Sequence, residues 1–187
     1  MESPKTIATV NFANPERTKI MAKGYAGEIK SAPNWDVLTP DVRFRTWEFK
    51  EIDGNKKDGA LIEIKPGGRT PVQHIESNTV FCEVPQTGKL TFLSVSPKGE
   101  LFIETFDSEI DDTSYMMELG KGWTMCWVAN PDQKDPAEVL EFEEPGFKSA
   151  KLPTVQEGAT EINGHPLPQS LWKTIDQLVK SSTLEVE

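Results

Sequence analysis

Residues 63–93 read EIKPGGRTPVQHIESNTVFCEVPQTGKLTFL, and the alternation of apolar runs and turn residues in this stretch decides the fold class. A Pro66-Gly67-Gly68 turn follows the first apolar run, and Gly88 separates the last two. These residues favour turns because proline fixes its own φ angle and glycine accepts positive φ. The stretch therefore predicts strand, turn, strand, hairpin and strand.

Similar short runs continue along the chain on both sides of this stretch. In VRFRTWEFK, which starts at Val42, apolar and charged residues alternate with the period of a half-buried strand. Further strands are predicted over residues 60–64, 78–84, 89–96, 100–106, 115–119, 123–129 and 139–143, with turns at 53–59, 86–88, 96–99, 107–112, 120–122 and 130–132. Strands this short and closely spaced predict an antiparallel sandwich or barrel.

The two ends of the chain differ from this pattern. Residues 1–40 contain scattered Pro, Gly and Asn, and we interpret them as an arm with one candidate edge strand at 7–12. After a Pro-rich passage, the apolar residues of the last segment recur on one face of an amphipathic helix. They are Leu171, Ile175, Leu178 and Val179. Residues 149–187 are therefore predicted as a connection and a helix, packed on the barrel or on a partner subunit.

The composition limits the classes of function. With 187 residues and 20.9 kDa, the chain has the length of one domain. Its 30 acidic and 20 basic residues give a net charge of −10, which repels a phosphate backbone, so we expect no nucleic-acid partner. No apolar run approaches the roughly 20 residues of a membrane span. The N-terminal residues lack the pattern of a secretory signal, so we expect a cytoplasmic protein that does not bind membranes.

Residues 62–93 resemble the first conserved motif of the cupin superfamily. In that family, a Pro-Gly turn precedes a His-x-His pair, a Glu and a second Gly, and the three side chains bind a divalent metal inside a small barrel. If Pro66-Gly67 is the turn, the two His positions fall on Gln73 and Ile75, and the Glu position on Thr79 or Phe81. The resemblance implies an all-β fold, a single antiparallel jelly-roll barrel over residues 41–148 with a C-terminal α-helix.

The second motif of the family resembles residues 119–147. Gly122 starts it and Asn130 matches the family's Asn, but Cys126 stands where the family has its His. Because the ligand positions of both motifs hold other residue types, the resemblance predicts a cupin-like protein without a tightly held metal cofactor.

A metal-dependent interpretation remains open. If Gly68 leads the first motif, His74 and Glu76 fall on the two His positions. Imidazole, carboxylate and thiolate groups all bind zinc or iron, so a ligand set of His74, Glu76, Glu83 and Cys126 is chemically permissible.

Glu83 is the first of two predicted catalytic residues. It shares strand parity with Phe81, which should face the barrel interior. Burial there would raise the pKa of the carboxyl and suit it to proton transfer. The alternative is a position at the barrel rim, where Glu83 pairs with Arg69 or Lys89.

His74 is the second predicted catalytic residue, as a general base. Its parity is opposite to that of Gln73, so without a bulge it faces away from the pocket. A hydrogen-bonded structural histidine is the alternative. His165, in the segment NGHPLP, is interpreted as a solvated loop residue.

The predicted substrate-binding residues come from three segments and are Gln73, Glu76, Phe81, Trp123, Met125, Cys126, Trp127, Arg43 and Arg45. In residues 123–129, the Trp and Met side chains share one strand face and Cys126 lies on the other, and the sequence leaves open which face is internal. Cys126 could act as a nucleophile only if a nearby cation lowered its pKa. Arg43 and Arg45 share a face and could clamp a carboxylate or phosphate.

Three functions follow from these residues. The first is a metal-independent acid–base enzyme of the isomerase, epimerase, lyase or cyclase type, acting on a small polar metabolite inside the barrel. The second is a metal-dependent cupin of the dioxygenase type with atypical ligands, and the third is a non-catalytic module that binds or senses a ligand. Cupins commonly pair through edge strands, so we also expect a homodimer.

Overall fold

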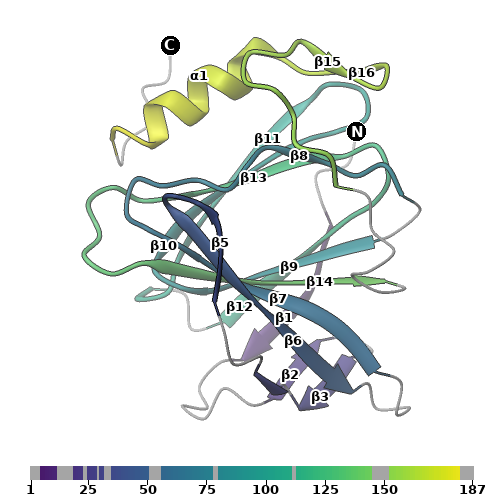
Figure 1. Ribbon diagram of the computed structural model, residues 1–187, viewed down its shortest axis with the longest axis vertical. Coiled ribbons are helices and arrows are strands. Elements are labelled where there is room, and N and C mark those ends of the chain that lie inside the picture. The colour runs from purple at the N-terminus through teal and green to yellow at the C-terminus, as the bar shows by residue number, and fades with distance from the viewer. Residues whose placement is uncertain are drawn as a thin grey trace.

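The computed structural model describes residues 5–11, 19–22, 25–28, 30–31, 35–50, 56–77, 80–110, 113–144 and 152–181. Its centre consists of two antiparallel sheets that face each other, and the C-terminal segment covers the outer face of the smaller one (Figure 1). The strands are β1 (Lys5–Asn11), β2 (Lys19–Ala22), β3 (Tyr25–Glu28), β4 (Lys30–Ser31), β5 (Asp36–Thr39), β6 (Val42–Lys50), β7 (Lys56–Ile64), β8 (Gln73–His74), β9 (Val80–Thr87), β10 (Lys89–Val95), β11 (Leu101–Asp107), β12 (Thr113–Leu119), β13 (Thr124–Ala129), β14 (Ala137–Glu144), β15 (Glu161–Ile162) and β16 (His165–Pro166). The helix is α1 (Gln169–Leu178).

The larger sheet has the strand order β1-β12-β9-β14-β7-β6-β4, and β5 also pairs with β6. The smaller sheet has the order β11-β10-β13-β8. From β7 onward, the chain passes repeatedly between the two sheets, as in a jelly roll. The predicted antiparallel all-β fold with a C-terminal helix is therefore confirmed, as two facing sheets.

Most predicted strands coincide with observed ones, but the turn predicted over residues 53–59 is partly wrong. Residues Lys56 to Gly59 belong to β7, which pairs with β6 from Lys50↔Lys56 onward. The Asn, Asp, Gly and Lys residues of this segment favour a turn, but pairing with β6 gives hydrogen-bond partners to the backbone groups that face β6. Pairing with β6 therefore overrides the local preference.

The space between the two sheets is filled by the interior core, a cluster of buried apolar side chains from both sheets. The residues of the interior core are Val42, Ala60, Ile62, Ile64, Ile75, Phe81, Leu90, Phe92, Met117, Leu119, Met125, Trp127, Ala129, Ala137 and Val139. They occupy alternate positions of their strands, because successive side chains of a strand point to opposite faces.

A second cluster, the outer core, lies between the smaller sheet and the C-terminal segment. Its buried residues are Val72, Leu93, Val95, Cys126, Val128, Val155, Leu167, Leu171, Ile175 and Leu178. Three of the four apolar residues predicted for one helix face are buried there, while Val179 is half-buried at the end of the helix. Figure 1 shows α1 and the β15–β16 hairpin on the side of β8, β10, β11 and β13, so the helix packs on the barrel.

The N-terminal residues add strands to the larger sheet. β1 pairs with β12 at one end of the strand order and includes residues of the candidate edge strand at 7–12 as far as Asn11. Phe12 lies outside the described residues. The homodimer expected from this edge strand stays a prediction.

Candidate functional site

Two carboxyl side chains lie side by side within the apolar interior. Glu83 on β9 pairs in register with Glu141 on β14, and their exposed fractions are 0% and 5%. The two carboxyls lie in one row across the larger sheet, and the next residues of that row are Met117 on β12 and Ala60 on β7. Both carboxyls point inward because their strand parity matches that of the interior core residues Phe81 and Val139, as the sequence predicts for Glu83.

Trp127 joins this pair from the opposite sheet. Its indole Nε1–H donates a hydrogen bond of 2.9 Å to Glu83 Oε2, and its ring packs on Phe92 with centroids 4.5 Å apart. The rim position considered for Glu83 is therefore wrong. Its two possible partners are engaged elsewhere, since Arg69 pairs with Glu157 and Lys89 with Asp107.

The two carboxyls titrate together. Burial raises the pKa of Glu141 above its ordinary value of 4.5, and a hydrogen bond with Glu83 offsets part of that rise. Two adjacent carboxylates in an apolar environment repel each other, so the pair retains one proton more readily than two exposed carboxyls would. It can accept a proton at one oxygen and donate from the other.

The raised pKa of Glu141 predicts that stability falls as the pH rises. The unfolded chain loses this proton near pH 4.5 while the folded chain keeps it, so the free energy of unfolding falls from about pH 4.5 up to the folded pKa. We expect melting temperatures measured from pH 4.5 to 8 to decline less for Glu141→Gln than for wild type, because glutamine has no proton to lose. Equal slopes for the two proteins would contradict this.

A second polar atom faces the interior, on the smaller sheet. Ser94 is 1% exposed, and its Oγ has no hydrogen-bond partner among the described residues. Ser94 pairs in register with Met125, which in turn pairs with Gln73, so the three side chains form a row that faces the interior. The hydroxyl therefore keeps its capacity to donate and accept hydrogen bonds unused within the protein. Sequence reasoning missed Ser94 and Glu141, although both share parity with apolar core neighbours.

Three of the positions that match metal ligands of the cupin motifs hold core residues, whereas Gln73 is a half-buried residue of β8. Ile75 and Phe81 are fully buried in the interior core, Thr79 lies outside the described residues, and Cys126 points to the outer core. Burial raises the pKa of the Cys126 thiol to about 11, which keeps it protonated and opposes a role as nucleophile. Among the residues that the structure describes, no group of three His, Cys, Asp or Glu side chains is placed to hold a metal ion.

His74 lies on the opposite face of the smaller sheet from the carboxyl pair. It is 1% exposed, and its Nδ1 is 2.9 Å from Thr124 Oγ1. Its parity predicts this outward direction, and the structure does not bring His74 and Glu83 together. The expectation for His165 is wrong, because His165 lies half-buried in β16 with its ring centroid 5.2 Å from that of His74. Glu76 also lies near His74, and its side chain accepts a hydrogen bond from Asn163.

Acid should destabilise the fold through His74. Burial, and then the nearby His165, lower the pKa of His74 below 6.5, while Glu76 acts in the opposite direction. Below about pH 6.5, His74 becomes protonated in the unfolded chain but stays neutral in the folded chain. The free energy of unfolding therefore falls as the pH decreases toward the folded pKa of His74. We expect His74→Gln to weaken the loss of melting temperature between pH 6.5 and 5. An unchanged loss would show that His74 titrates normally.

Some of the remaining predicted site residues face the barrel interior and others do not. Met125 and Trp127 belong to the interior core, and Trp123 is partly buried against it. Arg43 and Arg45 have the opposite parity to the core residue Val42 and lie over the ring of Trp35, at 4.5 and 4.8 Å. Arg43 also forms a two-point ion pair with Glu63, at 2.6 and 3.0 Å. The two arginines therefore do not face the barrel interior.

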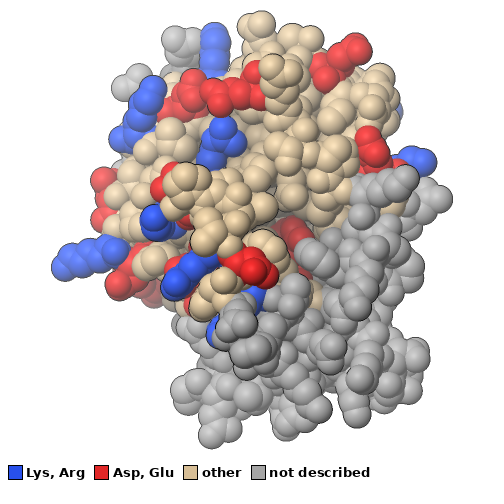
Figure 2. Space-filling model, viewed as in Figure 1, with Lys and Arg blue, Asp and Glu red and all other residues tan. Residues whose placement is uncertain are grey.

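Within the described part of the chain, no helix combines the length and apolar character needed to cross a membrane. On the face shown in Figure 2, basic and acidic side chains are interspersed.

No family model matches the sequence, and no curated protein matches it. Similar solved structures include tomato vicilin, with 8% identity, a TM-score of 0.48 and coverage of 65% of this chain and 32% of that chain. Another is Lactobacillus farciminis oxalate decarboxylase in a formate complex, with 16% identity, a TM-score of 0.46 and coverage of 64% and 33%. A third is the Drosophila melanogaster CENP-C cupin domain, with 8% identity, a TM-score of 0.43 and coverage of 63% and 71%.

The match spans about a third of the vicilin and oxalate decarboxylase chains. The chain's own topology agrees with the motif pattern of residues 62–93, because β7 and β9 lie in the larger sheet while β8 and β10 lie in the smaller one. The chain has a jelly-roll fold of two facing antiparallel sheets.

Proposed function

We propose that this protein binds a small polar molecule inside the barrel and exchanges a proton with it through the Glu83–Glu141 pair, without a tightly held metal. The burial of two adjacent carboxyls in the interior core carries the proposal. Burying unpaired charge is costly, and perturbed carboxyls in such positions are typical of acid–base sites. The reaction class is isomerisation, epimerisation, elimination or cyclisation, all of which need a base and an acid close together.

Binding groups for the ligand lie on the smaller sheet. Ser94 Oγ and the Gln73 amide face the interior from the same cross-strand row, with Met125 between them. Trp127 lies two residues beyond Met125 on β13, and side chains two residues apart on one strand face are about 7 Å apart. A ligand of metabolite size can therefore contact Ser94 and Trp127 together. The Met125 and Met117 side chains are unbranched and change rotamer readily, which gives the packed interior a means of admitting a ligand.

The same packing supports a second candidate, a non-catalytic module that binds or senses a ligand. Glu83 is 0% exposed and Ser94 is 1% exposed, so a ligand that reaches either of them requires side chains to move. Binding at Ser94, however, does not require contact with Glu83. The two candidates differ in whether a bound molecule is converted.

The test is a screen of small polar metabolites for thermal stabilisation, followed by assay of every hit for conversion. Ser94→Ala should weaken binding under both candidates, because it removes one hydroxyl without changing the packing. Glu118→Gln is the matched control, since Glu118 lies on the neighbouring strand β12 but is exposed. A hit that binds equally well to Ser94→Ala and is never converted would place the site outside the barrel.

We expect no stoichiometric transition metal after dialysis, because Ile75 and Phe81 fill positions where the family has ligands. Elemental analysis of protein purified without chelator measures this directly. One equivalent of zinc, iron, manganese or nickel would contradict the prediction and favour the metal-dependent alternative.

A further inference from the structure

Both histidines of the chain lie where the β15–β16 hairpin covers the outer face of the smaller sheet, an interface that the proposed function does not use. His74 on β8 is 1% exposed, and the ring centroid of His165 on β16 lies 5.2 Å from that of His74. Imidazole is the side chain whose charge changes near neutral pH, and two positive charges this close repel each other. The contact therefore favours neutral rings.

Each ring is held through its Nδ1 atom. His74 Nδ1 lies 2.9 Å from Thr124 Oγ1, and His165 Nδ1 lies 3.3 Å from the backbone carbonyl oxygen of Pro97. A carbonyl oxygen only accepts, so His165 donates this hydrogen bond, whereas a threonine hydroxyl can donate or accept. A neutral imidazole has one N–H and satisfies either contact. Neither ring therefore needs a second proton for the hydrogen bonds that hold it.

The hairpin docks closely against two turns that contain glycine. A Cβ at Gly99 would stand 2.9 Å from Pro166 Cγ, and a Cβ at Gly122 would stand 3.2 Å from His165 Cε1. Both glycines have a positive φ angle, +86° and +87°, which residues with a side chain rarely adopt. The docked hairpin therefore encloses the two imidazoles and excludes the water that would solvate a charge on His74.

The surroundings of His74 favour its neutral form on balance. Burial, and then His165, lower the pKa of His74, whereas Glu76 acts in the opposite direction. Glu76 also accepts a hydrogen bond from Asn163 at the tip of the hairpin. β13 and residues 153–155, which contact His74 as well, carry no charged side chain. The remaining charged side chains of the hairpin and of the two turns are exposed, and they are Lys98, Lys121 and Glu161.

We propose that the β15–β16 hairpin is a pH-sensitive latch, which stays docked while both imidazoles are neutral and is released when His74 takes up a proton. Release lets water solvate the imidazolium and separates it from His165. Because the docked form binds this proton less readily, acid favours the released form. If the released form has the ordinary His pKa of 6.5, its population rises by up to about tenfold between pH 7.5 and 5.5.

Hydrogen exchange at pH 7.5 and 5.5, followed by mass spectrometry, tests the latch on the protein alone. No ligand is needed, so the outcome does not depend on the proposed function. The backbone N–H of Leu167 donates to the carbonyl oxygen of Thr160 at 2.8 Å, which closes the hairpin. A two-stranded hairpin is marginally stable on its own, so release should expose this amide. After correction for the direct effect of pH on exchange, the amides of residues 161–167 should exchange up to about tenfold faster at the lower pH.

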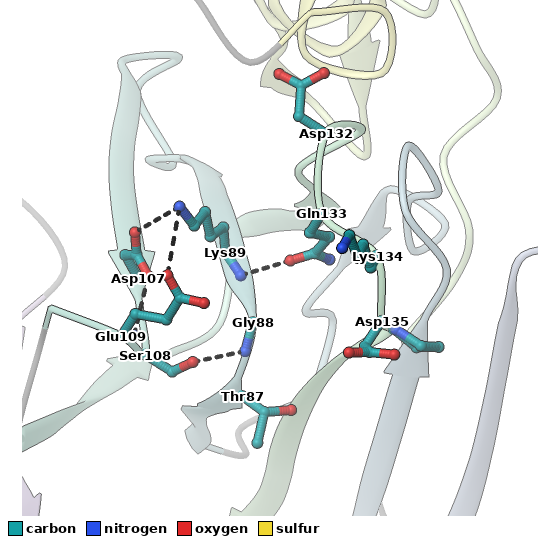
Figure 3. Close-up of a pocket in the computed structure, with 11 residues that line it drawn as sticks. Thr87, Gly88, Lys89, Asp107, Ser108, Glu109, Asp132, Gln133, Lys134 and Asp135 are labelled. Carbon is teal, nitrogen blue, oxygen red and sulfur yellow. Dashed lines mark hydrogen bonds and ion pairs between the residues drawn. The ribbon is translucent and has the colours of Figure 1, made fainter.

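Amides at the opposite end of β10 serve as the internal reference. The backbone N–H of Gly88 donates to Ser108 Oγ at 2.9 Å, and that of Lys89 donates to Gln133 Oε1 at 2.7 Å (Figure 3). No histidine occurs between residues 75 and 164, so the corrected exchange of these two amides should stay unchanged. An equal increase at both places would indicate global unfolding and overturn the latch, as would unchanged exchange of the hairpin.

Variants assign the effect to the two imidazoles. His74→Gln removes the titrating group, so the acid-induced increase in hairpin exchange should fall below about twofold. His165→Gln removes the neighbouring imidazole, while the glutamine amide can still donate to the Pro97 carbonyl, and the increase should become smaller. His165 is only half-buried, so this variant keeps the fold and tests the latch independently of His74→Gln. Glu161→Gln, an exposed carboxylate of the same hairpin, is the matched control and should respond as wild type. A full acid response in both histidine variants would overturn the proposal.

Discussion

Replacing Glu83 by glutamine is expected to lower the turnover of a converted ligand by about 10²- to 10⁴-fold, the usual contribution of a general acid or base. Glutamine has the size of glutamate, and its carbonyl oxygen can still accept the hydrogen bond from Trp127 Nε1. Its amide can donate to Glu141, so the pair keeps a hydrogen bond but cannot exchange a proton. The variant should therefore fold and bind while losing the chemical step.

The measurement compares initial rates, ligand-induced stabilisation and melting temperature for wild type, Glu83→Gln and Glu141→Gln. Binding should change by only ~1 to 3 kcal/mol, the scale of one hydrogen bond to a charged group. Glu118→Gln, with its exposed carboxyl on the adjacent strand, should match wild type in all three. If Glu83→Gln and Glu141→Gln keep full turnover, the carboxyl pair is not the acid–base group.

Leu171→Ala should destabilise the protein by about 2 to 5 kcal/mol, as truncation of a fully buried leucine usually does. Leu171 is 1% exposed and belongs to the outer core with Cys126 and Val128 of β13. In a chain of this length, each kcal/mol lowers the melting temperature by about 2 to 4 °C. The decrease in the free energy of unfolding measures how much the packing of the C-terminal helix on the smaller sheet stabilises the protein.

Thermal unfolding followed by circular dichroism gives this value, and Lys173→Ala provides the control. Lys173 lies on the same helix but is exposed, and such a substitution usually changes stability by less than about 0.5 kcal/mol. If Leu171→Ala and Lys173→Ala melt at the same temperature, the helix contributes little to the stability of the barrel.

Local patterns in the sequence were sufficient to predict most of the strands, the helix, and the sheet face to which single side chains such as Glu83 and His74 point. The inward direction of Glu83 and the outward direction of His74 both follow from the two-residue period of a strand, because that period depends only on the backbone. The same period applies to Ser94 and Glu141, whose parity with apolar neighbours could have revealed them. Neither residue was among the predicted site residues.

The function of a side chain depends on what the fold brings next to it, and this only the tertiary structure decided. The Glu83–Glu141 pair requires the register of β9 on β14, and the contact of His74 with His165 requires the C-terminal hairpin to fold over the smaller sheet. Both contacts join segments that are far apart in the chain. Strand periodicity therefore determines which face a residue occupies in this protein, whereas long-range pairing determines which residues share that face.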